Sequence, residues 1–209
     1  MKIGIFGGTF NPPHNGHVRM AEKVAEELEL DKTLIIPNKM PTHKRCEELA
    51  TNDERFDMCK LVFTNEKFEL SRIEMDRPSD SYMILTLNQL RKIYPDAEFY
   101  LIIGSDMFLM LHKWYKYKEI MEQCNICVCA RNNEDTLLEL RKYAFDKLGI
   151  YIKDRDGKNI HISTLDAYEV SSTDIRERTR DGRSVFGLCS PQIIEYMESH
   201  KLYGYRKKW

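Results

Sequence analysis

Short apolar runs alternate along this chain with longer segments in which apolar residues recur every three or four positions. The first run, residues 2–6, is rich in β-branched and aromatic residues and is long enough for one buried strand. In the next segment, 18–28, the apolar residues recur at helical spacing. The same pattern predicts further strands at 33–37, 68–71, 98–103, 125–130 and 160–163, and further helices at 52–65, 82–94, 136–148 and 192–199.

Strands and helices that alternate in this way predict a mostly parallel sheet with helices on both faces, which is an α/β, Rossmann-like, doubly wound fold. A length of 209 residues suits one such domain with a sizeable core, so we expect residues 1–209 to form a single domain. No linker, internal repeat or low-complexity tract interrupts the pattern.

The charge balance limits the kinds of partner that the chain suits. Charged residues make up 31% of it, but 32 Lys and Arg nearly cancel 33 Asp and Glu, so nucleic acid is not favoured. No apolar run approaches the roughly 20 residues of a membrane-spanning helix, and the chain enters its first strand directly. We therefore expect a cytoplasmic protein with no membrane partner, and the composition leaves a homo-oligomer open.

Three of the six cysteines, Cys124, Cys127 and Cys129, cluster at the strand predicted for 125–130. A zinc site would need a fourth ligand at a recognisable spacing, and neither a second Cys pair nor a nearby His pair follows. Cysteine is commonly buried as a small apolar residue. The sequence therefore predicts reduced cysteines in the core rather than a metal site.

The segment between the first strand and the first helix, residues 7–17, has the composition of a ligand-binding loop. Its glycines allow the backbone to approach a phosphate closely, and the following helix start offers N–H groups with a partial positive charge. His14 and His17 flank Gly16, so both rings can face one ligand. The loop matches neither standard phosphate motif, Gly-x-x-x-x-Gly-Lys-Ser/Thr or Gly-x-Gly-x-x-Gly.

Polar residues follow other predicted strands, at the edge of the sheet where ligands bind in open α/β folds. Asp106 can accept from ribose hydroxyls or cap the next helix. Lys44 lies in a basic loop that can reach an anionic substrate if the sheet is parallel. Near the carboxyl end, hydroxyls at 171–173 precede a helix that carries Arg176, which suits either a polyphosphate site or a capped surface helix.

Together these motifs resemble the nucleotidyltransferase superfamily, whose signature is His-x-Gly-His after the first strand. The resemblance is closer to bacterial nicotinate-nucleotide adenylyltransferases, in which Gly-Gly-Thr-Phe-Asp-Pro-x-His-x-Gly-His is typical, and Asn11 stands here at the aspartate position. Residues 81–87 resemble their Ser-Tyr-Thr-x-x-Thr-Leu, with Met83 in place of the first threonine, and 171–176 resemble their Ser-Ser-Thr-x-Ile-Arg. The resemblance covers nearly the whole chain.

The resemblance implies a transfer in NAD biosynthesis, in which the phosphate of nicotinate mononucleotide attacks the α-phosphorus of ATP and pyrophosphate leaves. It implies that His14 and His17 are catalytic and that Mg²⁺ enters with ATP, held mostly by phosphate oxygens and water, so that no metal-binding cage of protein residues is expected. The implied ATP-binding residues are Gly7, Gly8, Thr9, Phe10, His14, Gly16, His17, Gly104, Asp106, Ser172, Thr173 and Arg176. The implied mononucleotide-binding residues are Lys44, Tyr82, Met83, Asp106, Trp114 and Tyr115, with Trp114 stacked on the pyridine ring.

Other functions stay open at this point. A sibling adenylyltransferase would use nicotinamide mononucleotide or phosphopantetheine as acceptor. An aminoacyl-tRNA synthetase relative shares a His-x-Gly-His-type element, but the near-neutral charge, the short chain and the missing Lys-Met-Ser-Lys-Ser loop disfavour it. A nucleotide-binding sensor would keep the same residues and perform no turnover.

Overall fold

The computed structural model describes residues 1–40, 48–131, 133–157, 159–165 and 170–205. Within them eight strands form one sheet in the order β3-β2-β1-β4-β5-β8-β7-β6. Neighbouring strands from β3 to β8 in this order are parallel, and β7 and β6 are antiparallel at one edge, so the predicted mostly parallel sheet is confirmed. The strands are β1 (Lys2–Gly8), β2 (Lys32–Pro37), β3 (Phe68–Leu70), β4 (Glu98–Gly104), β5 (Asn125–Arg131), β6 (Ile152–Lys153), β7 (Asp156–Gly157) and β8 (Ile160–Leu165).

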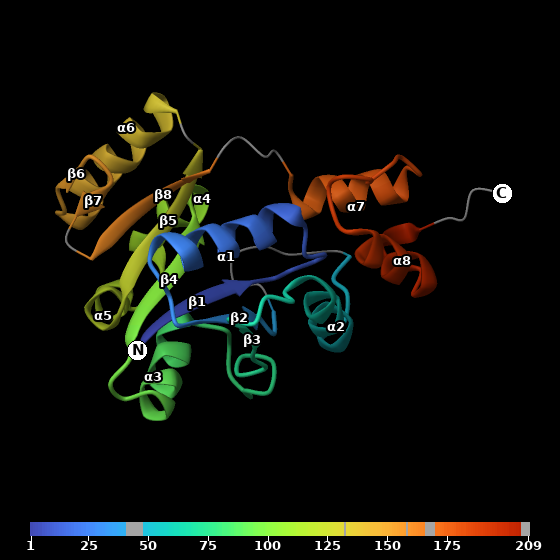
Figure 1. The fold of residues 1–209 in the computed structure, drawn as a ribbon, viewed down its shortest axis with the longest axis horizontal. Helices are drawn as coiled ribbons and strands as arrows, with labels where there is room; N and C mark the ends of the chain where they lie inside the picture. Colours follow the sequence, from blue (N-terminus) through green and yellow to red (C-terminus); the bar gives the residue numbers. More distant parts are fainter. Residues whose placement is uncertain (41–47, 132, 158, 166–169, 206–209) are drawn as a thin grey trace.

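Helices cover both faces of the sheet, as a doubly wound fold requires (Figure 1). Helix α1 crosses one face, α3 and α5 lie on the other, and α2, α7 and α8 gather beyond the carboxyl end of β1. The α-helices are α1 (Asn15–Glu27), α2 (Asn52–Val62), α3 (Met83–Ile93), α4 (Ser105–Phe108), α5 (Tyr117–Gln123), α6 (Glu134–Tyr143), α7 (Ser172–Arg180) and α8 (Pro191–Ser199). A π-helix, η2 (Ala144–Leu148), continues α6, and η1 (Leu111–Lys113) and η3 (Leu202–Gly204) are short 3₁₀ helices.

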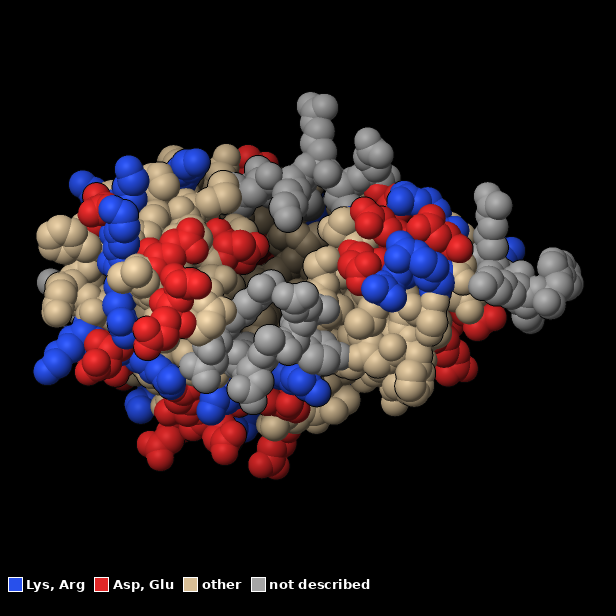
Figure 2. All heavy atoms as spheres, turned by 90° about the horizontal axis from the view of Figure 1, so that it is seen from above, with Lys and Arg blue, Asp and Glu red and all other residues tan. Residues whose placement is uncertain are grey.

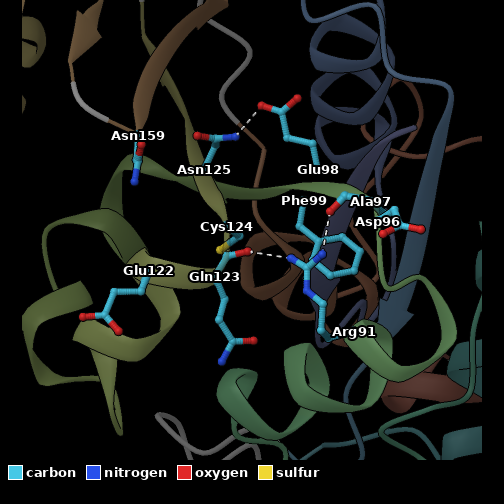
Figure 3. Close-up of a pocket in the computed structure, with 10 residues that line it drawn as sticks. All are labelled: Arg91, Asp96, Ala97, Glu98, Phe99, Glu122, Gln123, Cys124, Asn125 and Asn159. Carbon is cyan, nitrogen blue, oxygen red and sulfur yellow. Dashed lines mark hydrogen bonds between the residues drawn. The ribbon is translucent and has the colours of Figure 1, made fainter.

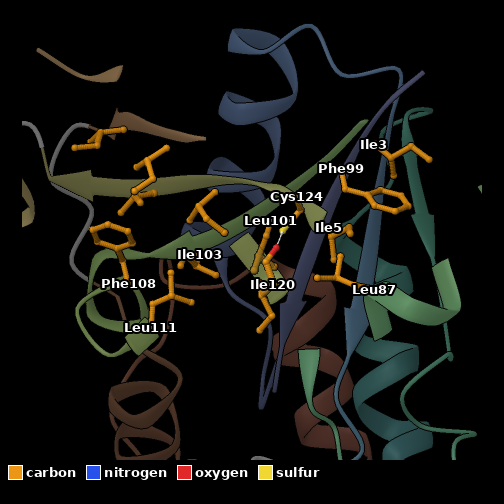
Figure 4. Close-up of a cluster of buried hydrophobic side chains, with 14 of the residues drawn as sticks. Ile3, Ile5, Leu87, Phe99, Leu101, Ile103, Phe108, Leu111, Ile120 and Cys124 are labelled. Carbon is orange, nitrogen blue, oxygen red and sulfur yellow. Dashed lines mark hydrogen bonds between the residues drawn. The ribbon is translucent and has the colours of Figure 1, made fainter. Parts of the chain in front are cut away.

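The central strands bury apolar side chains on both faces, because successive side chains of a strand point to opposite sides. Ile3 and Ile5 of β1 pack with Leu101 of β4 in the layer that includes α3 and α5 (Figure 4). Phe6 and Ile102 belong to the layer on the other face, beneath α1 and α2. This double burial explains why the central strands appear in the sequence as continuous apolar runs.

The strand order creates a crevice at the carboxyl end of β1. From β1 the chain runs outward through β2 to β3 and then returns to β4, on the opposite side of β1. The connections after β1 and β4 therefore leave the sheet in different directions. Such a switch point is where open α/β sheets bind ligands.

Some helix ends differ from the predicted ones, and side-chain capping explains the two that are helix starts. Helix α1 begins at Asn15 rather than 18, because His14 takes the N-cap position. Helix α6 begins at Glu134 rather than 136, because the side chain of Asn133 accepts from the N–H of Thr136. Helix α2 ends at Val62 rather than near 65, because the next residue has left the helical region with φ −92° and ψ 71°.

The three clustered cysteines lie in the core, as the sequence predicted. Cys124, Cys127 and Cys129 are buried free thiols, and burial raises the pKa of Cys124 to about 12. Acidic and basic side chains are interspersed on the face that Figure 2 shows. In the described part of the chain no helix is both long and apolar enough to cross a membrane.

Candidate active site

His14 and His17 cap the start of α1 reciprocally. The Nδ1 of His14 accepts from the backbone N–H of His17 at 3.3 Å, and the Nδ1 of His17 accepts from the backbone N–H of His14 at 3.2 Å. A ring nitrogen that accepts carries no hydrogen, so the neutral form of each ring carries its hydrogen on Nε2. Both imidazoles are thereby held as N–H donors whose orientation is fixed by the helix start.

The two rings are stacked and buried. Their centroids lie 3.6 Å apart with 22° between the planes, and the other side of His17 meets the ring of Phe10 at 5.0 Å. Burial lowers the pKa of His14 from 6.5 to about 4. Burial and the neighbouring His14 lower the pKa of His17 well below its usual value. Both rings are therefore neutral at pH 7, and each offers its Nε2–H as a hydrogen-bond donor.

Two glycines leave room for close contacts at this site. A Cβ on Gly16 would lie 3.0 Å from Cγ1 of Val170 and 3.1 Å from Nδ1 of His14. A Cβ on Gly104 would lie 2.7 Å from Oδ1 of Asp106. Distances under about 3.4 Å are tighter than ordinary contacts. A larger residue at position 16 would therefore push Val170 away from the first loop, whereas one at position 104 would displace the side chain of Asp106.

A cavity of about 450 Å³ lies along α1 as far as Glu26 and is closed by the end of β4, the first residues of α4, the end of β5 and Val170. Figure 2 shows this face hollowed near its middle. Among the predicted site residues, His14, Gly16, Gly104 and Asp106 line the cavity. The predicted alternative role of Asp106 as N-cap is wrong, because Gly104 caps α4 and Asp106 lies within its first turn.

Helix α7 lies directly against the first loop, although more than 150 residues separate them in the sequence. The hydroxyl of Ser172 donates to the carbonyl of Pro12 at 2.9 Å. Arg176 donates through Nη1 to the carbonyl of Asn11 at 2.9 Å and through Nη2 to Oγ1 of Thr173 at 3.2 Å. The structure thus brings the hydroxyls and the cation of the second motif to the loop that carries the histidines.

Asn11 is buried, and its side chain joins the first loop to two other segments, a role that the sequence did not indicate. Its Oδ1 accepts from the N–H of Ala50 at 3.0 Å and from the hydroxyl of Tyr203 at 2.7 Å. Its Nδ2 donates to the carbonyl of Glu48 at 2.9 Å. The signal in the sequence was the amide itself, because an aspartate at this position could not donate to that carbonyl.

Arg55 of α2 is, after Asn11, a second buried residue that joins the first loop to other segments. It is completely buried, and its guanidinium donates to the carbonyl of Thr9 at 2.7 Å and to the carbonyl of Asn38 at 2.7 Å. It also reaches the carbonyl of Ala50 at 3.2 Å. The available signal was its spacing, since Arg55 stands four residues before Cys59, which is also buried, and residues four apart share one face of a helix.

Of the predicted mononucleotide-binding residues, Asp106 lines the cavity, and the others that the structure describes come from the start of α3 and the residues after η1. The rings of Tyr82 and Tyr115 lie 5.0 Å apart, and Trp114 packs partly buried against the adjoining core. Met83 reaches the first loop, because its Cε lies 3.3 Å from the position that a Cβ on Gly7 would take. Lys44, the remaining predicted contact, lies outside the described residues.

A second cavity, of about 380 Å³, lies at the opposite end of the sheet, beside the first residues of β4 and β5 (Figure 3). There Arg91 donates to the carbonyls of Ala97 and Gln123, at 2.7 and 3.1 Å. Asn125 donates to Oε1 of Glu98 at 3.0 Å. These contacts join the ends of neighbouring elements, and none of the predicted site residues lines this cavity.

A family model and two full-length relatives match most of this chain. A family model described as cytidylyltransferase-like matches residues 5–178 of the chain. The chain is 36% identical over 213 residues to a probable nicotinate-nucleotide adenylyltransferase of Pelobacter propionicus, covering 98% of this chain and 99% of the relative. A protein of the same name from Geotalea daltonii is 34% identical with the same coverage.

Two solved structures share the fold at lower identity. They are described as Plasmodium falciparum nicotinic acid mononucleotide adenylyltransferase complexed with APC and with NaAD. The TM-scores are 0.73 and 0.75 at 15% and 16% identity, and each match covers 98% of both chains. At these identities the likeness shows a common α/β architecture.

Proposed function

The chain belongs to the cytidylyltransferase-like family, and we propose that it is an adenylyltransferase that joins ATP and nicotinate mononucleotide. The products are nicotinate adenine dinucleotide and pyrophosphate, in a step of NAD biosynthesis. Full-length relatives named nicotinate-nucleotide adenylyltransferases support the assignment. The reaction is expected in the cytoplasm, where ATP is available.

The observation that carries the proposal is the contact of α7 with the first loop beside the cavity. The loop supplies two neutral imidazole donors and a helix start, and α7 adds Ser172 and Arg176. Backbone donors at a helix start, hydroxyls and a guanidinium are the groups that bind polyphosphates. A cavity of about 450 Å³ next to them has the size of a small-molecule site.

Adenylyl transfer needs two anions brought into line and negative charge stabilised on the phosphoryl oxygens, with little covalent help from the protein. The phosphate oxygen of the mononucleotide forms a bond to the α-phosphorus of ATP, while the bond from that phosphorus to the bridging oxygen breaks. We assign the Nε2–H groups of His14 and His17 to the α-phosphoryl oxygens. Their reciprocal capping bonds orient these donors before ATP binds, which is the condition for efficient electrostatic stabilisation.

The remaining groups bind and orient the two substrates. Ser172, Thr173 and Arg176 are assigned to the β- and γ-phosphates, whose charge the start of α7 also favours. Lys44 is assigned to the attacking phosphate, and Asp106 to ribose hydroxyls. The backbone of the loop at Gly7, Gly8, Thr9 and Phe10 is assigned to close contact with ATP.

Mg²⁺ is expected to enter with ATP and supplies positive charge to the phosphate oxygens. In the described part of the chain no group of three His, Cys, Asp or Glu side chains is arranged to hold a metal ion. The cavity wall carries the carboxylates of Glu22, Glu26 and Asp106. Single carboxylates of this kind suit an ion whose other ligands are phosphate oxygens and water.

The choice of acceptor depends on one functional group, because nicotinate carries a carboxylate where nicotinamide carries an amide. Helix α3 begins after Tyr82 without a side-chain cap, so the N–H of Met83 stands in an uncapped first turn. A carboxylate accepts two such donors, whereas the NH₂ of an amide would face one and leave it unpaired. We therefore assign the carboxylate to the backbone near Met83 and Tyr115, with Trp114 stacked on the ring.

Pyrophosphate release with ATP and three acceptors tests this function. We expect kcat/KM for nicotinate mononucleotide to exceed that for nicotinamide mononucleotide by roughly 10²–10⁴, because each unpaired donor costs about 1–3 kcal/mol. Phosphopantetheine should give no turnover. Comparable rates with the two mononucleotides would overturn the acceptor assignment.

A tryptophan variant separates ring stacking from recognition of the carboxylate. Trp114→Ala should weaken both mononucleotides and leave most of their ratio intact, because stacking does not sense the substituent. ATP binding without pyrophosphate release from any acceptor would identify the protein as a nucleotide sensor instead.

A further inference from the structure

The turn η3 brings a tyrosine from the carboxyl end of the chain to the first loop. Tyr203 is 5% exposed, and its hydroxyl donates to Oδ1 of Asn11 at 2.7 Å across 192 positions of sequence. Its φ is 56°, and Lys201 and Gly204 beside it have φ values of 53° and 69°. A left-handed conformation is unfavourable for a residue with a Cβ and persists only where the surroundings hold it. The turn therefore keeps Tyr203 in a conformation that directs its hydroxyl inward.

The carboxamide of Asn11 is matched to the groups around it. The residue is 2% exposed, its Oδ1 faces the hydroxyl of Tyr203 and the N–H of Ala50, and its Nδ2 faces the carbonyl of Glu48. The amide oxygen of Asn11 can only accept a hydrogen bond, and its amide nitrogen can only donate one. These three contacts therefore fix the orientation of the amide. Of the three partners of this amide, Tyr203 is the most distant from Asn11 in the sequence.

The same residue is the point at which α7 docks. The backbone carbonyl of Asn11 accepts from Nη1 of Arg176 at 2.9 Å, and the next carbonyl, that of Pro12, accepts from Ser172 at 2.9 Å. The side chain of residue 11 is thus held by η3, and its backbone is held by α7. A shift of residue 11 would move the loop relative to Arg176.

We propose that Tyr203 is a positioning residue of the nucleotide site, which sets the distance between the first loop and α7 through Asn11. The inference rests on the proposed function, because it takes the first loop and α7 as the groups that hold the phosphates of ATP. A small displacement of groups that must meet one ligand weakens that ligand's binding and alignment. Tyr82 and Trp114, which are assigned to the mononucleotide, lie on other elements, at the start of α3 and the end of η1.

The test compares two tyrosines of the carboxyl-terminal segment. Tyr203→Phe removes only the hydroxyl that reaches Asn11. Tyr196→Phe is the matched control, because Tyr196 belongs to the same apolar cluster and its ring stacks on His200 with centroids 3.9 Å apart. ATP affinity is measured by calorimetry, KM by pyrophosphate release, and the first loop by hydrogen exchange of residues 7–17.

We expect Tyr203→Phe to bind ATP about 2- to 10-fold more weakly, which is the range of one lost hydrogen bond. Exchange in residues 7–17 should be faster, and KM for nicotinate mononucleotide should not change. Tyr196→Phe should match the unmodified protein in all three measurements. In an Asn11→Ala background, Tyr203→Phe should have no further effect, because the partner of the hydroxyl is already gone.

The outcomes separate this inference from the proposed function. Unchanged ATP affinity or unchanged exchange in Tyr203→Phe overturns it, and so does an equal loss for ATP and the mononucleotide, which would indicate general destabilisation. An equal effect of Tyr196→Phe also overturns it. If the unmodified protein binds ATP but releases no pyrophosphate, the transferase function fails, while affinity and exchange still decide the role of Tyr203.

Discussion

At the scale of single residues, the start of α1 and the proposed catalytic donors depend on the same two imidazoles. His14 and His17 each bind the backbone N–H of the other, and their rings stack at 3.6 Å. Burial keeps both rings neutral, so they act as hydrogen-bond donors rather than as cations. A change to either ring therefore affects both the helix start and the site.

Replacement of His17 by Ala should lower kcat by on the order of 10², because one preorganised donor to the transition state is lost. The ATP affinity, measured by calorimetry, should change less than kcat. His161→Ala is a suitable control, because His161 lies on β8, where its ring bonds to Asp156 at 2.6 Å and, at 3.1 Å, to Glu27 at the opposite end of α1 from the first loop. A His17→Ala enzyme that turns over at the unmodified rate would remove this histidine from the mechanism.

The lowered pKa of His14 predicts a loss of stability in mild acid. The folded state holds this ring neutral down to about pH 4, whereas the unfolded chain binds a proton near pH 6.5. The unfolded state thus binds more protons between these values, and the free energy of unfolding falls as pH falls through this range. Urea denaturation should show about 2 kcal/mol lost through this group between pH 7 and pH 5.

A His14→Asn variant isolates that contribution, because asparagine also serves as an N-cap but does not titrate. The variant should lose less stability than the unmodified protein over the same pH interval. Equal losses in the two proteins would show that His14 is not the responsible group.

At the scale of secondary-structure elements, α7 joins the second motif to the first. Its Arg176 is bonded to the first loop, whereas Arg178, two residues later, pairs with Asp174 of the same helix at 2.8 Å. Arg176, which faces the nucleotide site, and Arg178, which does not, can therefore be compared on the same helix.

Arg176→Ala should raise KM for ATP by about 10- to 100-fold, the value of a hydrogen bond to a charged group, with a smaller effect on KM for the mononucleotide. Arg178→Ala should leave both constants nearly unchanged, because an ion pair within an exposed helix surface contributes little. Steady-state kinetics, with the concentration of each substrate varied in turn, measures KM for ATP and KM for the mononucleotide. A larger effect on the mononucleotide would mean that α7 holds the other substrate.

The helices also show what local sequence can and cannot determine. Apolar spacing located α1, α3 and α8, because each buries one face against the sheet or its neighbours. It did not locate the first residues of α1 and α6, because these depend on side chains that cap backbone N–H groups. His14 is an unusual N-cap, and its partner His17 is needed to recognise it.

At the scale of the whole molecule, the sequence predicted the type of sheet, and the structure added the strand order. Strands buried on both faces leave long apolar runs, so β1, β2, β4 and β5 could be predicted individually. The site motifs could be placed at one edge because strands of a parallel sheet end together. Their catalytic and binding roles stay predictions until the variants above are measured.

The contacts that hold the motifs together were beyond sequence reasoning. Arg55 reaches Thr9 across 46 positions, and Tyr203 reaches Asn11 across 192. No spacing in the sequence predicts either contact, because the distance between the two residues of each pair depends on the complete packing of α2, α7 and η3. The sequence indicated which residues have the required chemistry, and the fold determines which of them meet.

The bond between Asn11 and Tyr203 has a consequence for the order of events during synthesis. The chain is made from its amino end at roughly 5–20 residues per second. The 192 positions between the two residues therefore take roughly 10 to 40 s to translate. The nascent protein can pair β1 with β2 and β4, and β4 with β5, in that time. Its first loop gains the contact with Tyr203 only when the final turn emerges. A ribosome that stops before Tyr203 would therefore release a chain whose sheet can form and whose nucleotide site stays incomplete.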